Sequence, residues 1–260
     1  MAAMKSVKRL FGLDKRRAPH PRLQLDLTET VVYAIGDVHG CLAELLALER
    51  IVVEDARTLP GRKLIVMLGD YVDRGPSSAQ VLDHLIAPAP DGFERICLTG
   101  NHELAMCDYL EGGIGLKAWL AMGAGPTLRS YGLDLDRLAE IYRSEQAVEK
   151  AIRETIPAAH LDFLRALPIL VESRNYIFVH AGVRPGIAMD KQVDDDLVLI
   201  RSAFFDNADL LTRYVVHGHT PVDEASRIGM HVSLDTGAYF SGRLTALRIW
   251  RNKGRYLTNR

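Results

Sequence analysis

Leu64-Ile65-Val66-Met67-Leu68-Gly69-Asp70-Tyr71-Val72-Asp73-Arg74-Gly75-Pro76 is an apolar run that ends in a turn rich in charge. The run predicts a buried strand, and the turn carries two carboxylates, an arginine and two glycines. An acid at the end of a buried strand costs free energy unless a positive charge meets it. The stretch therefore indicates a cation beside Asp70.

Four other stretches end apolar runs in the same way and place polar side chains there. Strands and helices alternate from residue 31 to residue 99, which predicts parallel pairing with right-handed crossovers. The carboxyl ends of such strands meet at one edge of the sheet, so the five polar stretches should converge. The four are Gly36-Asp37-Val38-His39-Gly40, Gly100-Asn101-His102-Glu103, His180-Ala181-Gly182 and His217-Gly218-His219-Thr220.

The predicted fold class is α/β, a two-sheet β-sandwich flanked by helices. Glycines and helical spacing interrupt the strand pattern between residues 104 and 167, which predicts a helical insertion there. Residues 1–22 are basic and are expected to form a flexible tail before a single domain at residues 23–260. Strands are expected at residues 31–35, 64–68, 94–99, 169–171, 176–179, 214–216, 231–237 and 243–250, with a further apolar strand at residues 197–200 before Arg201. Residues 194–196 are expected to form a solvated loop or a helix N-terminus.

Composition narrows the class of protein. The chain has 260 residues, 48% hydrophobic and 25% charged, enough for one full core. The net charge of −1 implies no general attraction to nucleic acid or to a membrane surface. Three unpatterned cysteines suit a reducing compartment, and no run of eighteen apolar residues exists. We expect a cytoplasmic protein without nucleic-acid or membrane partners; the oligomeric state stays open.

The five stretches together supply the side chains of a site for two divalent metal ions. Ions about 3.5–4 Å apart need one bridging ligand, and a carboxylate serves, so Asp70 is the candidate bridge. Imidazole and carboxylate without thiolate suit manganese, with iron, zinc or nickel as alternatives. The predicted metal ligands are Asp37, His39, Asp70, Asn101, His180 and His217.

Charge and position suggest what surrounds the metals. Arg74 and Arg201 would keep the site positive and bind a phosphate, although Arg74 could instead pair with Asp73. His102 is free to protonate a leaving oxygen as a general acid, with Asp73 holding its second nitrogen. Alternatively, His102 has a structural role. The assignment of Arg201 depends only on its place after an apolar run.

The motif set, in order over about residues 31–250, resembles that of the PPP-type phosphoprotein phosphatases within the calcineurin-like metallophosphoesterases. The resemblance implies a two-metal phosphatase with a central β-sandwich, like the short bacterial members of the family. It places the six ligands, the acid pair and the two arginines on the residues already named. It also implies a structural role for His219 and a supporting role for Glu103.

The predicted activity is that of a serine/threonine protein phosphatase that also accepts phosphotyrosine. A metal-bridging hydroxide would attack in line, with a phosphoprotein or phosphopeptide as substrate. Asp73 and Glu103 favour this branch. The alternative is a symmetrical dinucleoside tetraphosphate hydrolase or another nucleotide phosphohydrolase. A scaffold that binds phosphate without catalysis is a third possibility, although every proposed ligand and acid is present.

Overall fold

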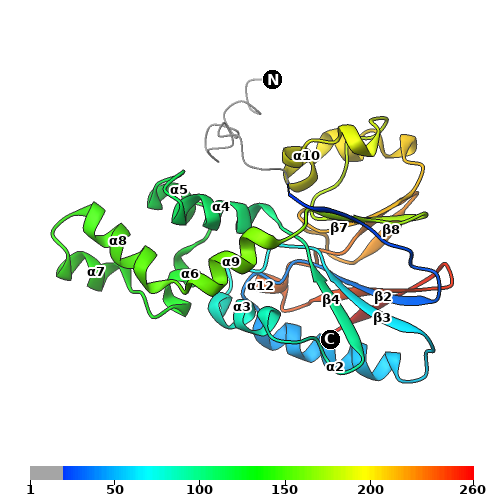
Figure 1. Cartoon of the computed structure of the whole chain (residues 1–260), viewed down its shortest axis with the longest axis horizontal. Coiled ribbons are helices and arrows are strands. Elements are labelled where there is room, and N and C mark those ends of the chain that lie inside the picture. The colour runs from blue at the N-terminus through cyan, green and yellow to red at the C-terminus, as the bar shows by residue number, and fades with distance from the viewer. Residues whose placement is uncertain (1–19) are drawn as a thin grey trace.

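The computed structural model describes residues 20–260, and in it two β-sheets face each other with helices outside (Figure 1). The confirmed fold class is thus α/β with a two-sheet sandwich. The five-stranded sheet has the order β11 (Lys253–Thr258), β10 (Thr245–Trp250), β2 (Thr30–Ile35), β3 (Arg62–Met67), β4 (Phe93–Cys97). The six-stranded sheet has the order β1 (Arg22–Gln24), β5 (Leu170–Glu172), β6 (Tyr176–Val179), β7 (Tyr214–His217), β9 (His231–Ser233), β8 (Ser226–Ile228).

Parallel pairing brings the strand ends of each sheet together. In the first sheet β2, β3 and β4 are parallel, and their last residues Ile35, Met67 and Cys97 lie in register. Helices α2 (Leu42–Ala56) and α3 (Ser78–Ile86) make the two crossovers. In the second sheet β6, β7 and β9 are parallel. The segments after these strands therefore gather at one end of the sandwich.

Alternation along the strands divides the core into two layers. Val32 and Ala34 of β2 belong to the cluster between the sheets, together with Phe178 of β6. Tyr33 and Ile35 point the other way and belong to the cluster that includes helix α2. A strand buried on both faces reads as a continuous apolar run, which is why the sequence reveals it.

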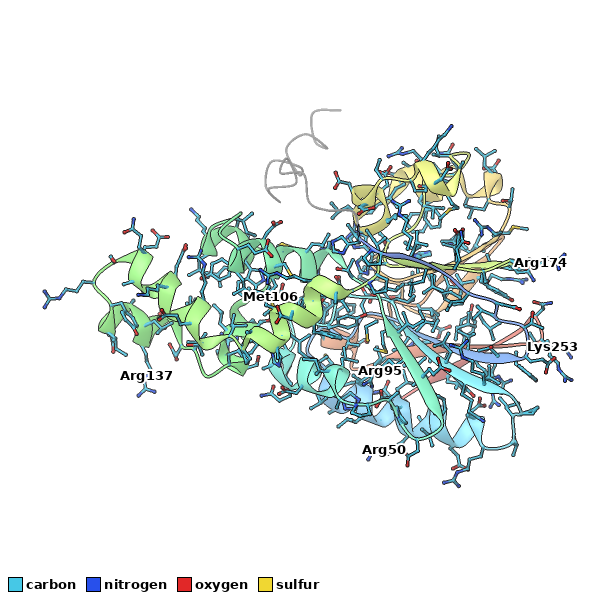
Figure 2. All side chains as sticks on the ribbon, viewed as in Figure 1. Arg50, Arg95, Met106, Arg137, Arg174 and Lys253 are labelled. Atoms are coloured by element: carbon cyan, nitrogen blue, oxygen red, sulfur yellow. The ribbon has the colours of Figure 1, made fainter. Side chains whose placement is uncertain are left out.

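The segment expected to be a helical insertion consists of short helices joined by turns, and it extends away from the sheets (Figure 1). Arg137, in α7, projects at its outer end, whereas Arg174 and Lys253 mark the opposite end of the molecule (Figure 2). Because α4 begins directly after β4, the insertion joins the sandwich at the carboxyl ends of the strands. Its helices are α4 (Asn101–Leu110), α5 (Leu116–Leu120), α6 (Gly125–Ser130), α7 (Leu135–Ile141), α8 (Glu145–Thr155) and α9 (Ala158–Ala166).

The prediction of an apolar strand at residues 197–200, before Arg201, is wrong. Residues Asp194–Leu199 form helix α10, and Ser202–Phe205 form α11. A short apolar run fits a buried helix as well as a strand, so periodicity could not decide. The three aspartates at the start of α10 favour the helix, since acids stabilise a helix N-terminus. The remaining short elements are η1 (Met189–Lys191), η2 (Ala208–Leu210) and α12 (Ala238–Ser241).

Residues 1–19 of the predicted tail, which was expected at residues 1–22, lie outside the described residues. Its last residues are part of the fold, because Arg22 begins β1 and pairs with Leu170 of β5. The Arg22 guanidinium also donates to the Asp194 carboxylate at 2.7 Å. Among the described residues, no helix is both long and apolar enough to cross a bilayer.

Candidate active site

The turn after β3 adopts a backbone that non-glycine residues rarely adopt. Asp70, Asp73 and Arg74 have φ of 52°, 69° and 68°. The carboxylate of Glu103 stabilises the start of the turn, accepting from the backbone N–H groups of Asp70 and Tyr71, both at 2.7 Å. Strained residues persist only where their surroundings hold them, and they gather at functional sites. Glu103, in the first turn of α4, thus fixes Asp70 at the sheet edge.

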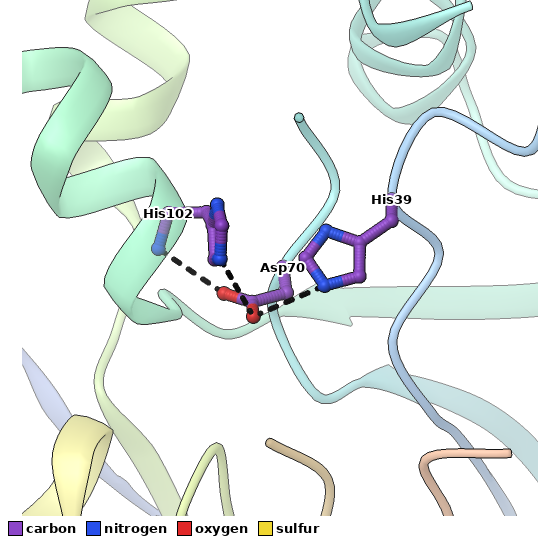
Figure 3. Close-up of side chains that lie close together, drawn as sticks. All are labelled: His39, Asp70 and His102. Atoms are coloured by element: carbon purple, nitrogen blue, oxygen red, sulfur yellow. Dashed lines mark hydrogen bonds and ion pairs between the residues drawn. The ribbon is translucent and has the colours of Figure 1, made fainter. Parts of the chain in front are cut away.

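The turn after β2 is hydrogen-bonded to the backbone of Asp70. The backbone N–H groups of Val38 and His39 donate to the Asp70 carbonyl at 3.1 and 2.8 Å. The His39 ring donates from Nδ1 to the Val72 carbonyl at 2.8 Å, which leaves Nε2 3.5 Å from Asp70 Oδ2 (Figure 3). Burial lowers the pKa of His39 to about 3, so the ring is neutral and Nε2 offers a lone pair.

A second group of acceptor atoms, from His180, Asn101 and His219, lies near the other carboxylate oxygen of Asp70, Oδ1. The His180 ring donates from Nδ1 to the Leu68 carbonyl at 2.9 Å. Its Nε2 lies 3.4 Å from Asp70 Oδ1, 3.0 Å from Asn101 Oδ1 and 3.2 Å from His219 Nδ1. Burial lowers the pKa of His180 and, with His180 nearby, lowers that of His219 well below its usual value. Neutral rings, an amide oxygen and a carboxylate that face one another need a cation between them.

The structure differs from the sequence-based expectation at His217. It is the last residue of β7, so it shares a face with Val215, away from the space between the sheets. Its Nε2 lies 3.3 Å from the Ser233 hydroxyl, and its ring packs against Phe204 and Phe205. The prediction of His217 as a ligand is therefore corrected.

His219 lies in the place expected for His217, although the resemblance implied a structural role for it. Its φ of 63° turns the chain after Gly218, and its ring groups with Asp70 and His180. Its Nε2 is buried without a hydrogen-bond partner among the described residues. The change of direction at a left-handed residue is what strand alternation could not predict.

Two carboxylates near Asp70, those of Asp37 and Asp235, lack enough counter-charge and provide a further test for metal. Burial and the carboxylates of Asp235 and Asp70 raise the pKa of Asp37 well above its usual value. Burial also raises the pKa of Asp235 to about 6. One oxygen of Asp37 has no hydrogen-bond partner in the described structure. The donor set fits two divalent cations that share Asp70, and each cation would offset this repulsion.

The predicted acid pair is formed. His102 Nδ1 donates to Asp73 Oδ2 at 2.8 Å, and Arg74 Nη2 donates to His102 Nε2 at 3.2 Å. Burial lowers the pKa of His102, but the carboxylates of Asp70 and Asp73 outweigh it and the net shift is upward. A guanidinium on Nε2 disfavours metal there, although His102 lies only 3.8 Å from Asp70 Oδ2.

The two predicted phosphate-binding arginines approach from different sides. Arg74 is half-buried, and its guanidinium lies over the ring of Tyr239. Arg201 is exposed and follows helix α10 rather than a strand; its guanidinium donates to the His219 carbonyl at 3.4 Å. Both guanidinium groups therefore border the cluster around Asp70, as a bound phosphate would require.

Residues 30–242 match a family model described as calcineurin-like phosphoesterase. The chain belongs to this family. It is therefore a phosphoesterase, and divalent metal ions belong to the chemistry of that family. The fold and the donor set around Asp70 agree with the match.

Curated relatives carry narrower names. The chain is 28% identical over 237 residues to an asymmetrical bis(5'-nucleosyl)-tetraphosphatase, PrpE, of Anoxybacillus flavithermus, covering 82% of this chain and 88% of that protein. It is 30% identical to the PrpE of Halalkalibacterium halodurans, covering 83% of this chain and 88% of that protein.

Solved structures agree on the fold. A protein named only as a candidate diadenosine tetraphosphatase aligns with a TM-score of 0.62 and 19% identity over 92% of this chain and 98% of its own. A cold-active protein-tyrosine phosphatase of a Shewanella species aligns with a TM-score of 0.53 and 17% identity over 93% and 83%.

Sequence reasoning did not single out Asp235, which is buried beside Asp37. The signal was weaker than at Asp70, because the stretch before Asp235, His231-Val232-Ser233-Leu234, alternates polar and apolar residues instead of forming an apolar run. The site thus includes a third strand-end acid.

Proposed function

We propose that this protein is a metal-dependent hydrolase that cleaves dinucleoside tetraphosphates asymmetrically, into a nucleoside triphosphate and a nucleoside monophosphate. The similarity to curated asymmetrical tetraphosphatases over four fifths of the chain carries the proposal. The leading sequence-based activity, phosphoprotein hydrolysis, becomes the second candidate. The alternative expected from sequence becomes the first, with asymmetrical rather than symmetrical cleavage.

The residues of the site would hold two metal ions with Asp70 between them. When bound, the ions would supply the charge that attracts phosphate oxygens and acidifies water, and manganese suits the nitrogen and oxygen donors. The proposed ligands are Asp37, His39, Asp70, Asn101, His180 and His219.

The groups around the metal ligands would bind and protonate the substrate. Arg74 and Arg201 offer planar donors to the anionic oxygens of a phosphate. A phosphate on the Arg74 guanidinium would draw it from His102 Nε2, which is then free to hold a proton for the leaving oxygen. Asp73 keeps the His102 ring in the tautomer with hydrogen on Nδ1.

Exposed aromatic rings border the site and suit a nucleoside. Tyr239 packs edge-on to His39 with ring centres 5.5 Å apart, and it is 41% exposed. Phe240 packs against Tyr239 and is 63% exposed. Both line a hollow of about 520 Å³ together with the start of α2. A base stacked on such a ring gains about 1–3 kcal/mol.

Analysis of the products tests the proposal. The manganese-loaded protein is incubated with diadenosine tetraphosphate, and the nucleotides are separated by chromatography. ATP and AMP in equal amounts are expected. Two ADP molecules would indicate symmetrical cleavage, and an intact substrate beside rapid dephosphorylation of a phosphoserine peptide would overturn the proposal.

The acid pair favours the second candidate, phosphoprotein hydrolysis. A serine alkoxide is a much more basic leaving group than a nucleotide phosphate, so it gains more from protonation by His102. A comparison of kcat/KM on a phosphoserine peptide and on diadenosine tetraphosphate ranks the two candidates directly.

A further inference from the structure

The helical insertion contacts the acid pair directly. The hydroxyl of Thr127, in α6, donates to Asp73 Oδ1 at 2.9 Å. The indole of Trp119, in α5, donates from Nε1 to Asp73 Oδ2 at 3.2 Å. The His102 ring donates from Nδ1 to the same Oδ2 at 2.8 Å. Asp73 is fully buried, and the two donors from the insertion together with His102 satisfy both of its carboxyl oxygens.

The insertion also supports the strained backbone of the turn. Asp73 donates from its backbone N–H to the Thr127 hydroxyl at 2.8 Å, and Arg74 donates to the Gly123 carbonyl at 2.9 Å. Both Asp73 and Arg74 are left-handed, a conformation that costs of order 1–3 kcal/mol. A β-carbon on Gly123 would meet Arg74 Cγ at 3.1 Å, so this approach is close. The insertion therefore packs against the turn that carries Asp73 and Arg74 and accepts hydrogen bonds from its backbone.

The contact is anchored on the sandwich side as well. The Ser78 hydroxyl lies 2.9 Å from that of Thr127 and accepts from the Asp73 backbone N–H at 3.1 Å. Ser130, at the end of α6, accepts from the Ala79 backbone N–H at 3.0 Å. One hydroxyl donates once and accepts twice, so the Thr127 oxygen is fully used by Asp73 and Ser78. The position of α6 is thus fixed against the start of α3.

We propose that the insertion is a positioning element for the acid pair, in which Thr127 and Trp119 orient Asp73 and thereby hold His102 with hydrogen on Nδ1. The inference depends on the proposed role of His102 as general acid. Loss of an outer hydrogen bond behind a metal-binding imidazole typically costs about 10–100-fold, and we expect a similar cost behind His102. The cost should appear mainly where protonation of the leaving oxygen limits the rate.

The first experiment compares two substrates in Thr127→Val. Phenolate is a much more basic leaving group than 4-nitrophenolate, so phenyl phosphate depends more on the general acid. For Thr127→Val, kcat is expected to fall about 10-fold or more on phenyl phosphate and only about 2-fold on 4-nitrophenyl phosphate, with KM little changed. Equal losses on both substrates would overturn the proposal.

Two variants separate positioning from stability. Thr127→Ser keeps the hydroxyl and should restore most of the rate on phenyl phosphate. Tyr131→Phe is the matched control, because it removes a hydroxyl of the insertion that contacts His160 at 2.6 Å and not Asp73. Tyr131→Phe should lower thermal stability without any difference between the substrates. A substrate difference in Tyr131→Phe would show that loosening the insertion alone is enough.

A measurement on the ring itself needs no turnover. In ¹⁵N-labelled protein, the His102 imidazole should show hydrogen on Nδ1, and Thr127→Val and Trp119→Phe should reduce that population. An unchanged tautomer would overturn the proposal. His102→Asn tests the proposed acid role separately: if it slows both aryl phosphates equally, the acid role fails, whatever Thr127→Val does.

Discussion

At the residue scale, the imidazoles of the site divide their two nitrogens between different tasks. His39 and His180 each donate from Nδ1 to a backbone carbonyl, which fixes the ring and leaves Nε2 facing Asp70. His102 donates instead to a carboxylate, Asp73. Burial lowers the pKa of His39 and His180, so their rings are neutral and suitable for metal. At His102 the carboxylates of Asp70 and Asp73 outweigh burial, so they raise its pKa and favour its protonated ring.

His102→Asn should lower kcat on the order of 10²–10⁴-fold on a phosphate ester with a basic leaving group. Asparagine can neither protonate the leaving oxygen nor accept from Arg74 in the same way. Steady-state kinetics with metal analysis checks this, and metal content should equal that of the unaltered protein. An unchanged rate with full metal content would contradict the role.

His219→Ala should weaken metal binding about 10-fold or more, because its ring is one of the groups that converge on Asp70. His217→Ala, two residues away, is the matched control and should keep the metal. His217→Ala removes the packing of the ring against Phe204 and Phe205, which should lower the free energy of unfolding by about 2 kcal/mol. Metal titration followed by calorimetry measures both affinities. The reverse result, with loss of metal in His217→Ala alone, would reject the assignment.

At the scale of elements, helix α4 and the turn after β3 are joined by a single carboxylate. Glu103 accepts from the backbone N–H groups of Gly100, Asp70 and Tyr71. It caps α4 and holds the left-handed Asp70 with the same two oxygens. The helix and the metal-binding turn therefore form one unit.

Glu103→Ala should reduce the free energy of unfolding by on the order of 3 kcal/mol, because buried N–H groups lose their acceptor. Urea denaturation followed by circular dichroism measures the loss. Glu54→Ala removes an exposed glutamate from α2 and should change stability by about 0.5 kcal/mol or less. Similar values for both variants would mean that the turn is held by other contacts.

Runs buried on both faces, such as Val31–Ile35, identify their strands because no solvent face interrupts the apolar pattern. The positions of strand ends likewise predicted that Asp37, His39, Asp70, Asn101 and His180 lie close together. The sequence could not decide between His217 and His219, since the choice depends on one left-handed residue. Nor could it show that Thr127 reaches Asp73, because that contact spans 54 positions, with three helices and a strand between the two residues.

At the scale of the whole molecule, the site lies where the two sheets meet and contains buried charges from both. Asp37 and Asp70 come from the five-stranded sheet, and His180 and Asp235 follow strands of the other sheet. The repulsion that raises the pKa of Asp37 acts across this boundary. Bound cations would therefore link the halves of the sandwich.

Chelation should lower the thermal midpoint of unfolding by on the order of 5 °C, since a ligand at about 100 times its Kd adds about 2.7 kcal/mol. Differential scanning calorimetry with and without chelator measures the shift. Asp70→Asn lacks the shared carboxylate and should show neither metal binding nor a response to chelator. An equal midpoint before and after chelation of the unaltered protein would contradict the link between the sheets.

The pairing of β2 with β10 has a consequence for synthesis. Ile35 lies in register with Ala246, so β2 has no partner on that side until a segment far later in the chain has been synthesised. Until then one edge of β2, apolar on both faces, has no neighbour, and such edges attract other chains. Nascent chains stopped before residue 245 should consequently be the ones that recruit chaperones, and release should coincide with completion of the last hairpin.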